Sequence, residues 1–466
     1  MGLNEALADA FARYGDAPAL LSQDGQILNF KKLGHTVSVL ATRLRDEGVG
    51  PGQCVALLTD NRTLRNALML ATFRVGADMA LVNATAPLVR RGQNIDAAIR
   101  FADQNAEGVD RSIVFSQDWL SGKADPNMTF AAPGIIIAGT SGSTGEPRFV
   151  QFPPNAYFDL IPALHDGSGP SLGNVLVTVP ETGLMSIYTL FRALLAGHGH
   201  CGMSPTGMES LFEAERFGVR EFMATPLALN ELVMAAEAGA PKPNLARICV
   251  FGSVSERSLL QRAERVFRCP IGIVNGSTET GQTSFGIVDT ATYVTGWSGK
   301  PVSICETRIG DGEPRGASGR LFVRTSVGSI SGGYIGGPPA LDAEGWFDTG
   351  DIARIESDGV LMIEGRADNL INLGGGKYAA EKIETFAAEI TGVSMSAAVR
   401  LQDADGAVPA LGVAVVASDG FDAERLRDHL AKMLRTSAHI RVITAPNLPS
   451  LPTGKIDRRA VVALFG

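Results

Sequence analysis

The fold is decided by five consecutive stretches of sequence: VREFMA (219–224), TPLALNELVMAAEAG (225–239), RICVF (247–251), RSLLQRAERVF (257–267) and IGIVN (271–275). The first, third and fifth are short and apolar, as strands are, and the other two have helical apolar spacing. Thr225-Pro226 is typical of an N-cap followed by a first-turn proline, and Ser253 to Glu256 reads as a capping box before the second helix. The pattern predicts a β-α-β-α-β run with parallel strands.

The ends of these strands carry the first candidate site residues. In parallel sheets covered by helices, ligands bind at the carboxyl ends of the strands. Thr225, Gly252 with Ser253, and Asn275 with Gly276 should therefore line one crevice. The alternative interpretation is that these residues only form tight turns.

Outward from this core, the chain alternates strand and helix toward its N-terminus and changes character after residue 302. From there it has short strands and turns such as GWFDTGDIARIE (345–356), followed beyond Arg366 by about 100 residues that suit a small α+β domain. We therefore expect an α/β fold with a large N-terminal domain (1–365) of stacked mixed sheets and helices and a small C-terminal domain (366–466).

The composition excludes several classes of protein. The 466 residues include 41 Lys and Arg against 49 Asp and Glu, a net charge of −8, which argues against a general nucleic-acid binder. No stretch approaches the ~18 consecutive apolar residues of a membrane span, and the start MGLNEALADAF lacks the pattern of a secretory signal. The five cysteines are scattered singly, without a CxxC pair, and are expected to be buried free thiols. We expect a cytoplasmic protein without a nucleic-acid partner or membrane span.

A loop rich in glycine and hydroxyl residues follows the strand GIIIAG (134–139). Its sequence TSGSTGEPR (140–148) combines flexible glycines with hydroxyl donors, a composition suited to phosphate oxygens. It is not a Walker loop, because FVQF (149–152) suggests a second strand where a helix would be needed. A flexible linker is the alternative. The candidate phosphate-binding residues are Thr140, Ser141, Gly142, Ser143, Thr144, Gly145 and Arg148.

Four further residues carry charge in short polar segments. Glu279 is the only carboxylate of NGSTETG (275–281), and one carboxylate together with substrate phosphates commonly holds Mg²⁺. Asp351 and Arg366 can bind ribose hydroxyls and other oxygens. Lys455 is one of only nine lysines and stands in PTGKIDR (452–458). Taken singly, each could be structural.

Taken together, six segments resemble the adenylate-forming superfamily of acyl-CoA and aryl-CoA synthetases, nonribosomal peptide synthetase adenylation domains and beetle luciferases. They occur in the order and approximate spacing of that family, and the resemblance covers essentially the whole chain. The segments are TSGSTGEPR (140–148), NGSTETG (275–281), GRLFVRTSVGSISGGYIGG (319–337), GWFDTGDIAR (345–354), GRADNLINLGGGKYAAEKIE (365–384) and LPTGKIDRR (451–459).

The resemblance implies a role for each candidate residue. Residues 140–145 would hold the β and γ phosphates of ATP, Thr278 would contact the α phosphate and Glu279 would ligate Mg²⁺. Gly252 and Ser253 would lie by the adenine, and Asp351 and Arg366 would hold the ribose. Lys455 would bridge the substrate carboxylate and the α phosphate. Asp368 would be the hinge of a mobile C-terminal lid, and Gly374 to Gly376 would line the path of the incoming thiol.

The implied activity is that of an acid–thiol ligase. ATP would activate a small or medium carboxylic acid as its acyl-AMP with release of pyrophosphate, and CoA would accept the acyl group. Alternatives are loading of a carrier-protein phosphopantetheine, transfer to an amine, or a non-catalytic nucleotide-binding homologue. The sequence specifies neither the acid nor the oligomeric state.

The chain departs from the family pattern in three places. Arg148 replaces the usual lysine that ends the phosphate loop, and Asn275 replaces an aromatic residue expected beside the adenine. Glu181 and Thr182 stand where many acyl-CoA synthetases carry an aromatic residue or histidine that gates the acid pocket.

Overall fold

The structure is a computed structural model of the chain. It describes residues 2–22, 26–101, 106–140, 148–156, 161, 171–325, 333–337, 339–373, 376–402, 409–418, 420–451 and 454–466. Within these ranges, no helix combines the length and the apolar character that crossing a membrane requires.

The largest sheet contains the fold-deciding strands. Its spatial order is β15-β14-β13-β12-β11-β9-β10-β1-β2. The strands are β1 (Pro18–Leu21), β2 (Ile27–Asn29), β9 (Asn174–Val177), β10 (His200–Gly202), β11 (Val219–Ala224), β12 (Arg247–Phe251), β13 (Ile271–Ser277), β14 (Gly281–Val288) and β15 (Lys300–Pro301). Because β11, β12 and β13 pair in parallel, their carboxyl ends lie at one edge, which confirms the predicted β-α-β-α-β run.

The two crossover helices confirm one local prediction and overturn another. Helix α8 (Pro226–Glu237) begins as expected, with the Thr225 hydroxyl accepting a hydrogen bond from the Ala228 N–H. Helix α9 (Arg257–Phe267) has the predicted bounds, but the capping box from Ser253 to Glu256 is wrong. A capping box needs serine at the N-cap, and here Glu256 itself occupies the N-cap and makes no capping hydrogen bond.

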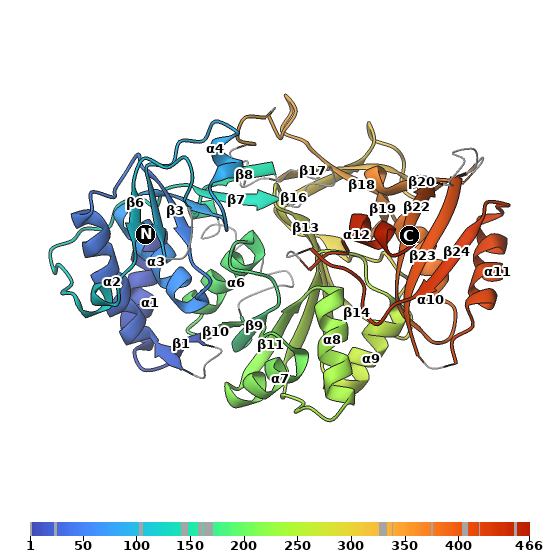
Figure 1. The fold of residues 1–466 in the computed structure, drawn as a ribbon, viewed down its shortest axis with the longest axis horizontal. Coiled ribbons are helices and arrows are strands. Elements are labelled where there is room, and N and C mark those ends of the chain that lie inside the picture. Colours follow the sequence, from blue (N-terminus) through green and yellow to red (C-terminus); the bar gives the residue numbers. More distant parts are fainter. Residues whose placement is uncertain are drawn as a thin grey trace.

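A second sheet of six strands lies beside the first (Figure 1). Its order is β6-β5-β3-β4-β7-β8. The strands are β3 (Cys54–Leu58), β4 (Asp78–Leu81), β5 (Ala97–Arg100), β6 (Ser112–Val114), β7 (Ile136–Thr140) and β8 (Arg148–Phe152). The antiparallel β7–β8 pair confirms that a second strand, and no helix, follows the glycine-rich loop.

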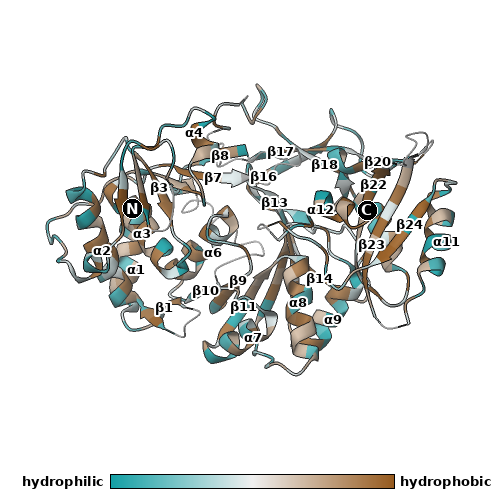
Figure 2. Cartoon of the chain, viewed as in Figure 1, coloured by the Kyte–Doolittle hydropathy of each residue, from teal (hydrophilic) through white to brown (hydrophobic). Residues whose placement is uncertain are grey.

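One continuous apolar core joins the two sheets. It includes Phe73 and Phe191, whose ring centroids are 5.8 Å apart, on α3 and α6. Figure 2 shows mostly brown, hydrophobic strands around β9 and β11 and helices of mixed colour, as expected for half-buried helices. All five cysteines are buried free thiols, as predicted. The helices of this part are α1 (Leu3–Tyr14), α2 (Phe30–Asp46), α3 (Arg62–Val75), α4 (Ala86–Val89), α6 (Leu184–Leu195) and α7 (Gly207–Arg216), with a 3₁₀ turn at Gln117–Ser121.

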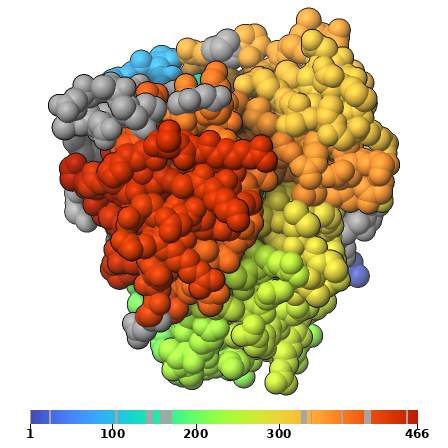
Figure 3. Space-filling model, turned by 90° about the vertical axis from the view of Figure 1, so that its right-hand side faces the viewer, coloured from blue at the N-terminus to red at the C-terminus, as the bar shows by residue number. Residues whose placement is uncertain are grey.

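The remainder of the chain forms an antiparallel sheet and a compact C-terminal unit. The sheet has the order β16 (Cys305–Ile309), β17 (Gly319–Thr325), β18 (Phe347–Ile355) and β19 (Leu361–Arg366). After a 3₁₀ turn (Ala367–Asn369) come β20 (Leu370–Asn372), β21 (Lys377–Ala379), α10 (Ala380–Ala388), β22 (Val393–Gln402), β23 (Pro409–Ala417), α11 (Ala423–Leu434), β24 (Ile440–Thr444) and α12 (Arg458–Ala463). The unit has its own apolar clusters and packs against the green and orange parts of the chain in Figure 3.

A buried carboxylate ties together the elements around β11. Glu221 on β11 is 0% exposed and accepts hydrogen bonds from Arg192 of α6 and Arg247 of β12, both at 2.5 Å. Burial disfavours the charged carboxylate, but the two guanidinium groups outweigh that effect and lower the pKa of Glu221. This cluster fixes one helix and two strands of the large sheet to each other.

We expect Glu221→Gln to reduce the free energy of unfolding by about 3–5 kcal/mol, because removing one partner leaves buried positive charge uncompensated. Urea unfolding at neutral pH measures this change. The matched control is Glu237→Gln, which removes a half-exposed ion pair with Arg262 and should cost under about 1 kcal/mol. Equal losses in the two variants would contradict the role given to the buried cluster.

Candidate active site

The carboxyl ends of β11 and β12 meet as predicted. Thr225 and Gly252 follow these strands directly, and a Cβ atom placed on Gly252 would lie 3.6 Å from Thr225 Cγ2. Asn275 and Gly276 lie within β13 itself, which turns back through Glu279 into β14. The crevice edge therefore consists of two strand-to-helix turns and one β-hairpin.

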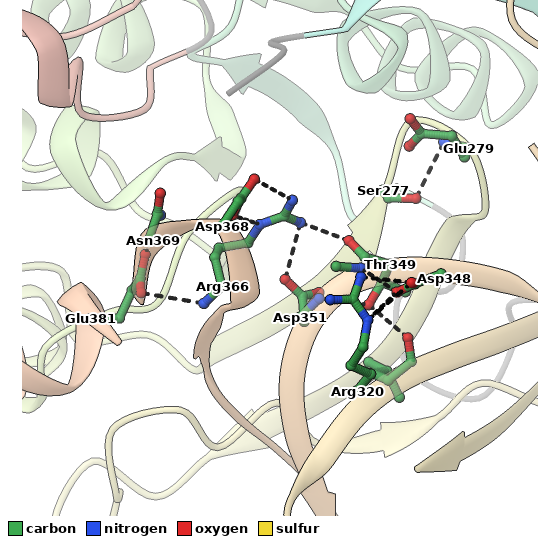
Figure 4. A network of polar contacts seen from close by, with 12 residues as sticks. Ser277, Glu279, Arg320, Asp348, Thr349, Asp351, Arg366, Asp368, Asn369 and Glu381 are labelled. Atoms are coloured by element: carbon green, nitrogen blue, oxygen red, sulfur yellow. Dashed lines mark hydrogen bonds and ion pairs between the residues drawn. The ribbon is translucent and has the colours of Figure 1, made fainter. Parts of the chain in front are cut away.

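Asp351 and Arg366 form an ion pair near this edge. They face each other on the paired strands β18 and β19, with Arg366 Nη1 3.3 Å from Asp351 Oδ1. Arg366 also donates to the Thr349 carbonyl and to both oxygens of Asp368, and Figure 4 shows these groups converging on its guanidinium. Burial raises the pKa of Asp351, although Arg366 and Lys455 act in the opposite direction. The neighbouring carboxylate of Asp348 instead binds Arg320.

Lys455 reaches the site from the far end of the sequence. A tight turn presents it, because the Leu451 N–H donates to the Lys455 carbonyl and the Gly454 N–H donates to the Leu451 carbonyl, both at 2.8 Å. Gly454 has φ of +73°, and a Cβ there would lie 2.8 Å from Thr225 Oγ1. Only glycine suits this position, both for its backbone angle and for its close approach to the end of β11.

The electrostatic surroundings of Lys455 contain the other candidate residues. Desolvation and the positive charge of Arg366 lower its pKa, whereas Asp351, Glu279 and Asp368 act to raise it. Its side chain is nevertheless exposed, so solvent moderates the lowering. The structure thus brings together Lys455, Arg366, Asp351 and Glu279 from four separate segments.

The Lys455 turn is fixed to the C-terminal unit by an arginine. Arg458 starts α12, donates to the Ala398 carbonyl at 2.8 Å and bonds Glu384 and Glu381 of α10. Glu381 also accepts hydrogen bonds from the Arg366 N–H and the Asn369 side chain, beside the proposed hinge. Glu381 therefore links the segment next to Asp368, the predicted hinge, to the segment that carries Lys455.

Glu279 lies at the tip of the β13–β14 hairpin. Ser277 Oγ accepts hydrogen bonds from the N–H groups of Glu279 and Thr280, which fixes the turn. The carboxylate of Glu279 accepts a hydrogen bond from the hydroxyl of Tyr334 at 2.5 Å. Burial and this hydrogen bond raise the pKa of Tyr334, so that the phenol remains a donor at neutral pH.

These groups fit Mg²⁺ better than a metal held by protein alone. Within the described ranges, no three His, Cys, Asp or Glu side chains are grouped so as to hold a metal ion. Mg²⁺ typically takes one or two carboxylates plus the phosphates of a substrate, and Glu279 with neighbouring hydroxyl groups provides such a donor set.

The phosphate-loop prediction can be followed only to its two ends. Ser141, Gly142, Ser143, Thr144 and Gly145 lie outside the described residues, as do Gly374 and Gly375 of the proposed thiol path. The backbone of Thr140 pairs with Arg148 across β7 and β8, so the loop starts and ends at this pair. Arg148 lies over the ring of Tyr334, 5.6 Å from its centroid.

Glu181, which departs from the family pattern, forms an ion pair with an arginine. It is buried, and its Oε1 lies 3.3 Å from Nε of Arg62 at the start of α3. Burial raises the pKa of Glu181, while Arg62 and Arg65 act against the rise. Sequence reasoning identified Glu181 as a departure but missed its partner, because no spacing rule connects α3 with the segment before α6.

The chain belongs to the AMP-binding enzyme family, whose model matches residues 7–98 and 117–335. It is 26% identical over 503 residues to a 4-chlorobenzoate–CoA ligase of Arthrobacter, an alignment that covers 99% of this chain and 95% of the relative. It is also 26% identical over 508 residues to phenyloxazoline synthase MbtB of Mycobacterium tuberculosis, covering 99% of this chain but 35% of that protein. These findings place the chain in the adenylate-forming superfamily.

Solved structures agree on the fold. The anthranilate CoA ligase AuaEII, in complex with anthranoyl-AMP, superposes with a TM-score of 0.85 at 17% identity and covers 100% of this chain and 97% of that one. The amide bond synthetase McbA of Marinactinospora thermotolerans gives 0.82 at 22% identity, with 99% of both chains covered. The expected α/β architecture is therefore confirmed.

A cluster of like charges lies where the C-terminal unit meets α9. Burial raises the pKa of Glu256 to about 8, and the carboxylates of Glu384 on α10 and of Glu389 at the C-cap of that helix add to the rise. Glu384 forms an ion pair with Arg458, and Glu389 contacts the His429 ring, with 2.8 Å between Nε2 and Oε2. Glu256 is therefore the member of the cluster that holds a proton at neutral pH.

This proton makes stability depend on pH. The folded state binds this proton more tightly than the unfolded state. The resulting contribution to the free energy of unfolding is therefore fully present below pH 4.5 and is lost as pH rises toward 8. Glu256→Gln mimics the protonated form and removes that loss. We expect the melting temperature of this variant minus that of the unsubstituted protein to increase from pH 5 to pH 8, as measured in thermal scans. A difference that does not change with pH would contradict the assignment.

Proposed function

We propose that this protein activates a small or medium carboxylic acid as its acyl-AMP, with ATP and Mg²⁺, and transfers the acyl group to the thiol of CoA. The observation that carries the proposal is the convergence of Arg366, Asp351 and Glu279 around Lys455, whose neighbour Gly454 lies against Thr225 at the end of β11. The names of the relatives, among them 4-chlorobenzoate–CoA ligase and 2-succinylbenzoate–CoA ligase, support an aryl acid as the first substrate class to test.

The proposed roles follow from the charges that the reaction develops. A carboxylate that attacks an anionic α phosphate meets like charge, and the departing pyrophosphate carries more, so cations must be held in place beforehand. Lys455 would bridge the acid and the α phosphate, and Thr278 would donate to the α phosphate. Mg²⁺ held by Glu279 would neutralise the phosphates, together with Arg148 and residues 140–145. Asp351 and Arg366 would bind the ribose, and Gly252, Ser253 and Asn275 would lie by the adenine.

The second half-reaction requires Lys455 to leave. We propose that residues 1–365 bind ATP and the acid, and that residues 366–466 rotate about Asp368 to bring another surface to the acyl-AMP. The structure offers an arrangement suited to adenylation, because Gly454 places Lys455 beside Thr225. A carrier-protein phosphopantetheine is the alternative acceptor, and an amine is a further one in view of the likeness in fold to McbA. The cytoplasmic location stays a prediction.

Pyrophosphate release from Mg·ATP across short, branched, dicarboxylic, aryl and amino acids, with and without CoA, tests the function. We expect release with one acid class and an increase with CoA, whereas a carrier loader would be nearly inert with CoA alone. Lys455→Ala should lower the acid-dependent rate about 10²–10³-fold, the usual loss for one transition-state cation. Lys432→Ala, which removes an exposed lysine of α11, is the matched control. An unchanged rate in Lys455→Ala would refute the mechanism, and a silent panel with intact ATP binding would favour a non-catalytic homologue.

The hinge is tested by substitutions at Asp368. Asp368→Pro fixes φ and should slow thioester formation at least about tenfold more than adenylation, because the rotation precedes only the second step. Asp368→Ala also loses the ion pair with Arg366 but keeps a flexible backbone, and it separates the two effects. Single-turnover measurements of each half-reaction decide the matter. If proline slows both equally, Asp368 is not the hinge.

A further inference from the structure

Tyr334 lies where three parts of the chain meet. It belongs to the short segment 333–335, between β17 and β18, which pairs with the edge of β8. The Gln151 N–H donates to the Gly333 carbonyl at 3.1 Å, and the Ile335 N–H donates to the Phe149 carbonyl at 3.0 Å. Tyr334 itself bridges Val150 in antiparallel fashion. Backbone pairing therefore fixes the tyrosine to the strand that begins with Arg148.

The side chain of Tyr334 contacts two candidate phosphate-site groups at once. Its hydroxyl donates to Glu279 Oε1 at 2.5 Å, and the Arg148 guanidinium lies over its ring, 5.6 Å from the centroid. Within the described ranges, Oε2 of Glu279 makes no recorded hydrogen bond or ion pair. Tyr334 thus connects the hairpin tip of the large sheet with the end of the phosphate loop.

We propose that Tyr334 is a positioning residue for Mg²⁺·ATP, which holds the Glu279 carboxylate in its metal-binding orientation and seats Arg148 at the end of the phosphate loop. This inference rests on the proposed role of Glu279 as the Mg²⁺ ligand. It assigns a function to a residue that the sequence motifs alone do not single out.

The hydrogen bond from the Tyr334 hydroxyl to Glu279 Oε1 is the contact through which Tyr334 would act on the metal site. A carboxylate at a hairpin tip can rotate freely, and an outer partner that fixes a metal ligand is typically worth 10- to 100-fold in metal affinity. The backbone of the tip is fixed separately by Ser277. Loss of the Tyr334 hydroxyl should therefore free the carboxylate without unfolding the turn.

The ring contact also accounts for arginine at position 148. A planar guanidinium stacks on an aromatic face more readily than a lysine ammonium does. Arg148 also makes a side-chain hydrogen bond to Tyr334, which partly offsets the rise in the pKa of the phenol. The departure from lysine at the end of the loop is thus matched by the tyrosine that supports it.

The test compares Tyr334→Phe, which keeps the ring and loses the hydroxyl, with Tyr14→Phe, which loses a hydroxyl bonded to the Leu195 carbonyl. Calorimetric titration with Mg²⁺ in the presence of a non-hydrolysable ATP analogue gives the metal affinity, and titration with AMP gives metal-independent binding. We expect Tyr334→Phe to weaken Mg²⁺ about 10- to 100-fold, to leave AMP binding unchanged and to recover turnover at high Mg²⁺. Tyr14→Phe should match the unsubstituted protein in all three.

Three results would overturn the proposal. Unchanged Mg²⁺ affinity in Tyr334→Phe refutes it, as does an equal loss of AMP binding, which indicates structural damage. If the unsubstituted protein binds the analogue without dependence on Mg²⁺, the role of Glu279 fails first and this inference fails with it.

The ring contact is tested by a double-mutant cycle. Arg148→Lys and Tyr334→Leu should each weaken binding of the Mg²⁺·ATP analogue, and the double variant should be less impaired than the product of the two single effects. If the effects of the two substitutions are independent and multiply, Tyr334 and Arg148 are not coupled in binding.

Discussion

The parallel alignment of β11, β12 and β13 is the constraint on which the rest of the structure depends. Backbone pairing puts the three carboxyl ends at one edge, and buried Glu221 holds β11 to β12 and to α6. Two further parts of the candidate site are placed by reference to that edge: the Glu279 hairpin continues β13, and the turn before Lys455 closes on Thr225. A change in the pairing of these strands would therefore separate Glu279 from Lys455, which are distant in sequence.

Positive charge reaches this site from three different segments, and two of the three cations are held by acidic partners or by a ring. Arg366 is paired with Asp351 and Asp368, and Arg148 stacks on Tyr334. Lys455 has no direct ion pair recorded in the described part of the chain and only shares the field of Asp351, Glu279 and Asp368. The most mobile cation in the proposed mechanism is therefore also the least restrained, while the two that would stay in place are fixed.

Local sequence patterns were sufficient to predict the helices and strands, but they did not predict the contacts between residues that are far apart in sequence. The strands and helices of 219–276 follow from periodicity and from the Thr225-Pro226 start, because those signals lie within a few residues of each other. The capping box predicted from Ser253 to Glu256 is wrong because the pattern specifies residue types but does not specify which residue is the N-cap. The pairs Tyr334–Glu279, Arg62–Glu181 and Arg458–Glu384 join residues that are far apart in sequence, and one sequence without an alignment gives no signal for them. The site residues could be named because the resemblance supplied them, whereas their supporting contacts had to come from the structure.

The contacts between the C-terminal unit and the rest of the chain bear on the proposed rotation. Leu227 packs against an apolar cluster of the unit, and Gly454 lies close to Thr225. Opposite them, the carboxylates of Glu384 and Glu389 add to the effect of burial on Glu256, whose pKa is raised to about 8, so that this side chain is neutral at neutral pH. Glu381 meanwhile binds both the backbone beside Asp368 and Arg458, so in the proposed rotation about Asp368 the Lys455 turn would move with α10 as one body. Such a connection suits the proposed mechanism, because the lysine would have to arrive in a fixed position for the first reaction and leave before the second.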